Sequence, residues 1–127
     1  MKIKQAKIIS ACKAIDKYNG KELPMKLGFE LYQLRSRLNV YWEFQTQKER
    51  EVISRYRYSI TPDGGVKFDS GEDEKKFLAE YNAVCRELGD EEVDLGEFTK
   101  QTVHLLEGVN MAIEDIAALS EFADFVE

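Results

Sequence analysis

The 127-residue sequence is poor in several residue types that would define a narrow class of protein. Its single histidine, His104, excludes a metal site built on two histidines. The two cysteines, Cys12 and Cys85, are far apart, and each falls in a segment of helical periodicity, where a reduced, buried thiol is the ordinary state. No stretch approaches the roughly 20 apolar residues that a membrane span needs. We therefore expect a cytoplasmic protein without membrane contact.

Basic residues are scarce in the second half of the chain. From Met1 to Tyr58 there are 13 Lys and Arg against 6 Asp and Glu, and from Ser59 to Glu127 there are 5 against 18, so halves of +7 and −13 give the net charge of −6. Such a split lets the two halves attract each other, within the fold or between subunits, and leaves room for a local basic surface. Two solvated faces of opposite charge would give the same count. The acidic remainder disfavours an extended nucleic-acid interface.

Apolar spacing predicts a mostly helical α+β fold in a single domain, residues 1–127. A first helix is expected over about residues 6–18, with Ile8, Cys12 and Ile15 on one face. A long helix of roughly 30 residues is expected from Pro24. Its main apolar stripe is Leu27, Leu31, Leu34, Leu38 and Tyr41.

The long helix also carries apolar residues outside this stripe: Phe29, Val40, Trp42 and Phe44. A second apolar face favours assembly as a homo-oligomer, in which another subunit covers it. A wide stripe packed by two neighbouring helices of the same chain would show the same pattern. The sequence leaves these two interpretations open.

The segment SRYRYSITPDGGVKF, residues 54–68, predicts a β-hairpin. Its turn has proline and aspartate in the central positions of a type I turn and Gly64 where a left-handed residue is required. The resulting register forms four cross-strand pairs: Tyr58 with Phe68, Ile60 with Val66, Ser59 with Lys67, and Arg57 with Asp69. The first two pairs are apolar and the last two are polar, which supports the register.

The remainder of the chain predicts three further parts. A returning antiparallel helix is expected over about residues 72–88, with Ser70 as its cap. Residues 90–110 predict one or two short strands, which join a strand at the N-terminus in a small sheet. A C-terminal helix is expected after Asn110. Its apolar face is Ile113, Ile116, Leu119, Ala123 and Val126.

One basic and aromatic segment is a candidate ligand site. Its residues lie at the end of the long helix and in the hairpin: Arg50, Arg55, Tyr56, Arg57 and Lys67. The cationic side chains can hold phosphates and Tyr56 can stack on a base, so a nucleotide is the expected ligand. The arginines also have ordinary structural explanations. Arginines at the C-terminal end of a helix interact favourably with its negative dipole, and Arg57 can form an ion pair with Asp69 across the hairpin. On the helix, Arg55 would pair with Glu51.

Motifs for catalysis are lacking. His104 lies in an apolar stretch, where a partly buried structural histidine is the commoner state. The acidic run over residues 91–97 lacks the ligand spacing of a calcium loop, and the DGG turn lacks the lysine of a phosphate loop. We expect a protein that is not an enzyme and has no cofactor.

The order of parts resembles a known family. KELPMKLGFELYQL follows a short first helix, a long helix and an acidic helix come next, and the chain ends in IEDIAALSEFADFVE. The likeness rests on Leu23, Pro24, Lys26, Val93, Leu95, Asp115, Ile116, Leu119 and Phe122. The chain is similar in these respects to a family of small proteins of unknown function encoded by tailed phages and prophages of Gram-positive bacteria. Because these are core and capping positions, the resemblance implies a shared fold and no shared active site.

The resemblance implies a viral protein acting in the host cytoplasm. We expect a non-catalytic binding protein that inhibits a host anti-phage defence, by sequestering a signalling nucleotide at the basic segment or by binding a defence protein. The alternative is a phage structural or assembly factor, which the extra apolar face of the long helix favours.

Overall fold

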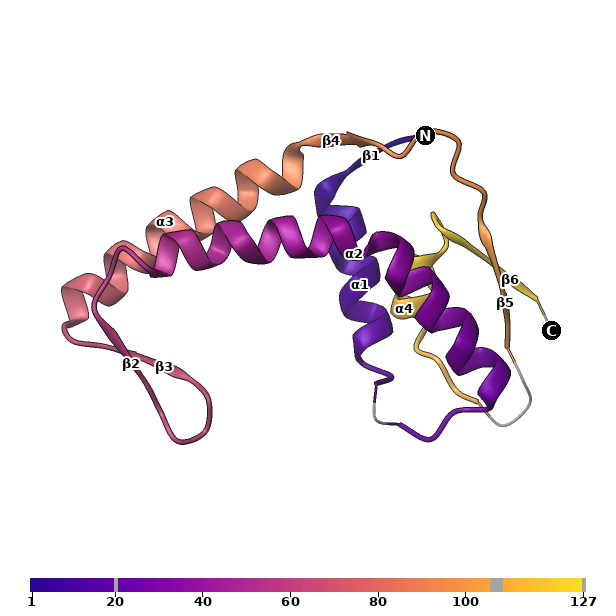
Figure 1. The fold of residues 1–127 in the computed structure, drawn as a ribbon, viewed down its shortest axis with the longest axis horizontal. Helices are drawn as coiled ribbons and strands as arrows, with labels where there is room; N and C mark the ends of the chain where they lie inside the picture. Colours follow the sequence, from indigo (N-terminus) through magenta and orange to yellow (C-terminus); the bar gives the residue numbers. More distant parts are fainter. Residues whose placement is uncertain (20, 106–108, 127) are drawn as a thin grey trace.

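Helices alternate with short strand pairs in the computed structural model, which describes residues 1–19, 21–105 and 109–126 (Figure 1). The elements follow in the order β1 (Lys2–Lys4), α1 (Gln5–Asp16), α2 (Met25–Ile53), β2 (Tyr58–Ile60), β3 (Val66–Phe68), α3 (Gly71–Asp90), β4 (Glu92–Asp94), β5 (Gln101–His104), α4 (Ile113–Leu119) and β6 (Ala123–Val126). The fold is the mostly helical α+β fold expected from the sequence, with the long helix, the hairpin and the returning helix at their predicted places.

The core lies where α1 packs under the N-terminal half of α2. The predicted stripe of α1, formed by Ile8, Cys12 and Ile15, is buried, and so are Leu27, Leu31, Leu34 and Leu38 on α2. Val103 of β5 and Phe122, which precedes β6, complete the same cluster. Burying one such side chain stabilises a fold by about 1.5–3 kcal/mol. We call α1, residues 25–39 of α2, α4, β5 and β6 the head.

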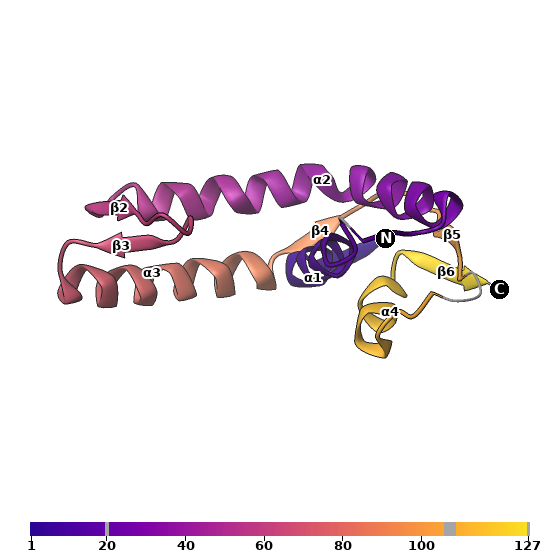
Figure 2. The same ribbon diagram turned by 90° about the horizontal axis from the view of Figure 1, so that it is seen from below.

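The C-terminal half of α2 and the whole of α3 form an antiparallel two-helix arm that extends from the head (Figure 2). Ser70 caps α3 as predicted, because its hydroxyl accepts a hydrogen bond of 3.1 Å from the amide of Asp73. The apolar side of α3, formed by Phe77, Tyr81, Val84 and Leu88, is only half-buried, and Gly89 is the one fully buried residue of this helix. A Cβ at Gly89 would lie 3.3 Å from the Cβ of Ala6, so this glycine lets α3 approach α1 closely.

The hairpin at the end of the arm has the predicted register. β2 and β3 are antiparallel, with Tyr58 opposite Phe68, Ser59 opposite Lys67 and Ile60 opposite Val66. Gly64 has a φ of 86°, the left-handed conformation that the turn requires. The base of the hairpin is fixed to the arm, because the ring of Phe68 lies 4.8 Å from that of Phe77 on α3.

Two further strand pairs close the fold. β1 pairs with β4 in the antiparallel sense, with Ile3 opposite Val93, which confirms the predicted small sheet. β5 pairs with β6 in the parallel sense, with Val103 opposite Phe125.

The predicted extent of the C-terminal helix is wrong. α4 ends at Leu119, and Ala123–Val126 form the strand β6 instead of two more helical turns. The apolar residues of this segment fit both periods, and pairing with β5 decides between them because it satisfies the backbone groups of both strands.

The second apolar face of α2 is uncovered. Phe29, Val40 and Phe44 are 59%, 62% and 53% exposed, so no helix among the described residues covers them. Trp42 differs: it is half-buried, and the guanidinium of Arg35 lies 4.8 Å from its ring centroid. The interpretation of a wide stripe packed by the chain's own helices is therefore wrong for Phe29, Val40 and Phe44. Among the described helices, none is long and apolar enough to cross a membrane.

Candidate binding site

The five residues of the predicted ligand site do not converge on one point. Arg50 lies in the last turns of α2, Arg55 and Tyr56 follow the helix, Arg57 precedes β2, and Lys67 lies in β3. Four of the side chains are exposed and Tyr56 is half-buried. The structure divides the set into three places, which are described in turn.

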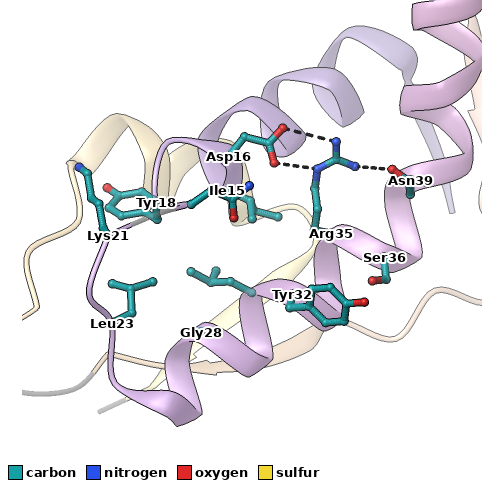
Figure 3. A pocket seen from close by; sticks show the side chains of 12 residues that line it. Ile15, Asp16, Tyr18, Lys21, Leu23, Gly28, Tyr32, Arg35, Ser36 and Asn39 are labelled. Carbon is teal, nitrogen blue, oxygen red and sulfur yellow. Dashed lines mark hydrogen bonds and ion pairs between the residues drawn. The ribbon is translucent and has the colours of Figure 1, made fainter.

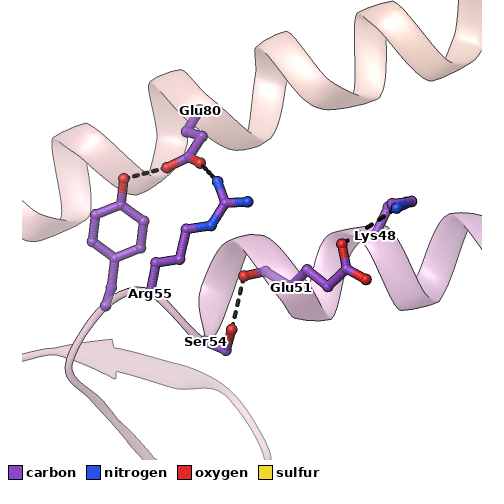
Figure 4. Close-up of polar contacts among 6 residues, drawn as sticks. Lys48, Glu51, Ser54, Arg55 and Glu80 are labelled. Carbon is purple, nitrogen blue, oxygen red and sulfur yellow. Dashed lines mark hydrogen bonds and ion pairs between the residues drawn. The ribbon is translucent and has the colours of Figure 1, made fainter.

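Arg55 and Tyr56 both bind Glu80 of α3 (Figure 4). The guanidinium of Arg55 pairs with one carboxylate oxygen, and the Tyr56 hydroxyl donates a hydrogen bond of 2.5 Å to the other. The bond from Tyr56, with a smaller contribution from Arg55, holds the pKa of Glu80 below its usual value, and the same bond raises the pKa of Tyr56. The predicted pairing of Arg55 with Glu51 is wrong, since Glu51 pairs with Lys48. Arg55 and Tyr56 therefore tie the end of α2 to α3.

The surroundings of Arg55 are unfavourable for an anion. Arg55 lines a pocket of about 290 Å³ between α2 and α3, together with Lys48, Glu51, Val52, Val84, Glu87, Leu88 and Glu91. Three carboxylates thus face two cations, and a phosphate placed there would meet like charge. This environment disfavours nucleotide binding at Arg55.

Arg50 faces a different pocket. That pocket, of about 470 Å³, is lined by Arg35, Asn39, Trp42, Glu43, Thr46, Gln47 and Arg50 of α2. Arg55 is not among these residues, so the two arginines line different pockets.

Arg57 and Lys67 lie on the polar face of the hairpin. The amide of Asp69 donates a hydrogen bond of 3.3 Å to the carbonyl of Arg57, which extends the β2–β3 register by one step. Asp69 and Arg57 are thus paired across the hairpin as predicted, but through a backbone hydrogen bond. Among the ion pairs of the described residues, none joins their side chains. Arg57 and Lys67 are therefore exposed hairpin side chains that remain available to a partner, as Arg50 is on α2.

The apolar face of the hairpin is also available. Ile60 and Val66, which face each other across the strands, are 73% and 44% exposed, and Tyr58 beside them is 41% exposed. Only Phe68, at the base, is packed against the arm, where it contacts Tyr56 and Phe77. A rigidly anchored ribbon with one apolar and one basic face is a surface suited to binding a macromolecule.

Another pocket lies between the end of α1 and the start of α2 (Figure 3). It has a volume of about 740 Å³, and Arg35 lies across it. The Arg35 guanidinium donates to both oxygens of Asp16, at 3.0 and 3.4 Å, and to the Asn39 side-chain oxygen at 3.0 Å. Sequence reasoning missed this pocket because Asp16 and Arg35 lie on different helices and no local pattern links them.

Two other polar contacts hold the head together. The Tyr18 hydroxyl and the Lys17 ammonium donate to the buried carboxylate of Asp115, at 2.8 and 2.9 Å. Burial raises the pKa of Asp115, but these two hydrogen bonds outweigh it and leave that pKa below its ordinary value. The carboxylate of Glu30 accepts the His104 amide at 2.7 Å and lies 2.6 Å from its Nδ1. His104 is thus bound by a neighbouring carboxylate and half-buried, the environment expected of a structural histidine.

A third polar contact lies in the arm. Glu49 of α2 accepts hydrogen bonds from the Tyr81 hydroxyl at 3.2 Å and from the Gln45 amide nitrogen at 3.5 Å. The Cys85 thiol lies 3.8 Å from the same oxygen, and burial raises its pKa, which makes it a poor nucleophile. Both cysteines are free.

Comparison of the chain with protein-family models, with curated proteins and with solved structures found no match. Within the part of the chain that the structure describes, no group of three or more His, Cys, Asp or Glu side chains could hold a metal ion.

Proposed function

We propose that this chain is a non-catalytic, phage-encoded binding protein that inhibits a host anti-phage defence by binding a defence protein in the host cytoplasm. The phage assignment rests on the sequence resemblance. The observation that supports the binding role is the hairpin, which carries an apolar cross-strand pair, Ile60 and Val66, 73% and 44% exposed at the end of an arm.

The hairpin has the properties of a recognition element. Its register is fixed by the turn at Gly64, and its base is held by the aromatic cluster of Tyr56, Phe68 and Phe77. Little conformational entropy is lost when such a preorganised ribbon binds. Arg57 and Lys67 on the opposite face add positive charge, which accelerates encounter with an acidic partner.

A protein partner fits the geometry better than a signalling nucleotide does. A nucleotide site at the basic segment requires Arg55 and Tyr56, and both are bound to Glu80. The residues that remain free on the hairpin are separated by the ribbon into an apolar face and a basic face. A protein surface can contact both faces, whereas a small ligand would reach only one.

The test compares the growth of phages that differ only in this gene on two hosts, one with the targeted defence and one without it. A phage carrying Ile60→Ser with Val66→Ser should grow normally on a host without the targeted defence and lose growth on a host that carries it. The matched control is Ile113→Ser, which changes an exposed apolar residue of α4 far along the chain and should leave growth unchanged on both hosts. The purified wild-type protein should retain the defence protein from host extract, and the double variant should not. Equal growth of wild type and double variant on both hosts would refute the proposal.

The alternative, a structural or assembly factor, is supported by the exposed apolar face of α2. In that case the protein binds a capsid or tail protein, and deletion of the gene blocks particle formation on every host. Normal growth of the deletion phage on a defence-free host would exclude it.

A further inference from the structure

We propose that the exposed face of α2 binds a second copy of this chain, as an antiparallel α2–α2 pair centred on Ser36. This inference goes beyond the proposed function, which uses the hairpin, and does not depend on it.

The face is large and apolar. Along one side of α2, the exposed fractions are 89% for Met25, 59% for Phe29, 69% for Tyr32, 62% for Val40 and 53% for Phe44. At about 150–250 Å² for each aromatic side chain, the three aromatic residues alone expose roughly 300–450 Å². Met25 and Val40 bring the face above the few hundred Å² that a monomer ordinarily exposes in one patch. A standard interface buries about 800 Å² on each partner, and this face can supply the apolar centre of an interface of that size.

The face is also sterically free. At about 100° per residue, Met25, Phe29, Tyr32 and Val40 lie on the side of α2 opposite the buried leucines, and Phe44 lies on the adjoining flank. Figure 2 shows α2 along one edge of the molecule, with α1, α3 and α4 all on the other side of it. A second helix can therefore approach this face of α2 without meeting α1, α3 or α4.

The apolar residues nearest Ser36 are spaced almost equally on its two sides, which favours a second copy as the occupant. Counted from Ser36, they lie 4, 7 and 11 positions toward the N-terminus, at Tyr32, Phe29 and Met25, and 4 and 8 positions toward the C-terminus, at Val40 and Phe44. A twofold interface must be self-complementary. In an antiparallel pair with Ser36 opposite Ser36, Tyr32 faces Val40 of the other copy, and Phe29 lies one position from direct opposition to Phe44. Met25 faces Gln47 at the rim, and the small serine allows the helices to approach at the centre.

Charge favours the antiparallel sense over the parallel one. Residues 25–39 carry three basic residues and one acidic residue, a net charge of +2, and residues 40–53 carry two basic and three acidic residues, a net charge of −1. The antiparallel pair places each basic half beside the acidic half of its partner. The helix dipoles also oppose each other in this arrangement.

The first test is the mass of the purified protein in light scattering over about 1–100 µM. The wild type should have twice the chain mass of 14.7 kDa. Val40→Asp should be a monomer, with its dimer affinity reduced at least about 100-fold, because two carboxylates become buried against Tyr32. Val40 is 62% exposed in one chain, so the circular dichroism of the variant should match that of the wild type.

The matched control is Val66→Asp, which places the same charge on the hairpin. This variant should remain a dimer in light scattering and should lose binding to the defence protein. The dimer and the proposed function are therefore tested by separate measurements. A monomeric wild type at about 100 µM, or a wild-type oligomer that Val40→Asp does not dissociate, would overturn the inference.

The second test is disulfide crosslinking, read by mass spectrometry of the linked peptides. Ser36→Cys should crosslink to itself, and a mixture of Tyr32→Cys and Val40→Cys should form the mixed dimer. Tyr32→Cys alone should not, because antiparallel pairing places the two copies of position 32 about 12 Å apart, beyond the roughly 7 Å limit for a disulfide. Efficient self-linking at position 32 would show a parallel pair and contradict the antiparallel arrangement.

Discussion

The hydroxyl of Tyr18, just after α1, donates a hydrogen bond of 2.8 Å to Oδ2 of Asp115 in α4. The two residues are 97 positions apart, and both are buried. The same hydroxyl accepts the amide of Ala112 at 3.2 Å, immediately before α4 begins. One phenol thus holds both the side chain and the backbone of the N-terminal turn of α4, and this contact fixes the short helix to the head.

Replacing Tyr18 should therefore destabilise the whole head. Tyr18→Phe keeps the ring but leaves Asp115 and the Ala112 amide short of a partner, which should lower the free energy of unfolding by about 1–3 kcal/mol. Tyr58→Phe is the matched control, since Tyr58 is 41% exposed on the hairpin and should change stability by less than about 0.5 kcal/mol. Urea denaturation of the three proteins measures both values. Equal stability of Tyr18→Phe and the wild type would contradict this account of the head.

The ionisation of Asp115 should make the stability of the protein depend on pH. Its pKa lies below the ordinary value of 3.8, so it contributes stability above that value and loses the contribution as the pH falls through its lower folded pKa. The difference in unfolding free energy between the wild type and Asp115→Asn should therefore be largest near neutral pH and shrink below about pH 4. Thermal melts of both proteins at several pH values measure it. A difference that stays constant down to about pH 2 would mean that the folded state does not lower the pKa of Asp115.

Arg55 should contribute to the arm and not to binding. Its side chain is 59% exposed in its ion pair with Glu80, and exposed pairs of this kind contribute about 0–1 kcal/mol. Arg55→Ala should thus lower stability by no more than about 1 kcal/mol and leave partner binding unchanged. Arg57→Ala with Lys67→Ala should weaken partner binding at low salt through a slower association rate. If the wild type binds a nucleotide and Arg55→Ala abolishes that binding, the ligand site does include Arg55, as the sequence predicts.

Gln45 is a residue whose replacement should stabilise the arm. It is 7% exposed, and its buried side-chain oxygen has no hydrogen-bond partner among the described residues. Gln45→Met keeps the shape and removes that polar atom, so the free energy of unfolding should rise by up to about 1 kcal/mol despite the loss of the 3.5 Å bond to Glu49. Gln47→Met, at an exposed position of the same helix, is the control and should have little effect. A fall in the free energy of unfolding of more than about 1 kcal/mol would show that the Gln45 amide stabilises the arm.

Local chemistry accounts for the parts of the fold that the sequence predicted. The stripe of α2 and the turn at Gly64 each depend on residues within a few positions of one another, so periodicity and turn preference were sufficient to predict them. The C-terminal segment was mispredicted because its apolar spacing fits a helix as well as a strand. The choice depends on β5, about 20 positions earlier, through backbone pairing that no side-chain pattern records.

The long-range contacts of the candidate site could not be predicted for the same reason. The sequence places Arg55 and Tyr56 in a ligand site because cations hold phosphates and an aromatic ring can stack on a base, and the local partner that it offers Arg55 is Glu51. Their partner is Glu80, 25 and 24 positions later, on a helix that returns beside α2. The hairpin residues Arg57 and Lys67 were assigned to the correct face because the register relating them is local.

The shallow burial of α3 divides the molecule into two units of different stability. Within this helix only Gly89 is fully buried, whereas α1 and the first half of α2 bury a continuous set of side chains. Backbone amides of Gly71–Asp90 should therefore exchange with solvent through local opening, at a lower free energy than the amides around Leu34 and Leu38, which exchange through global unfolding. The arm can thus open transiently, by separation of α3 from α2, while the head stays folded.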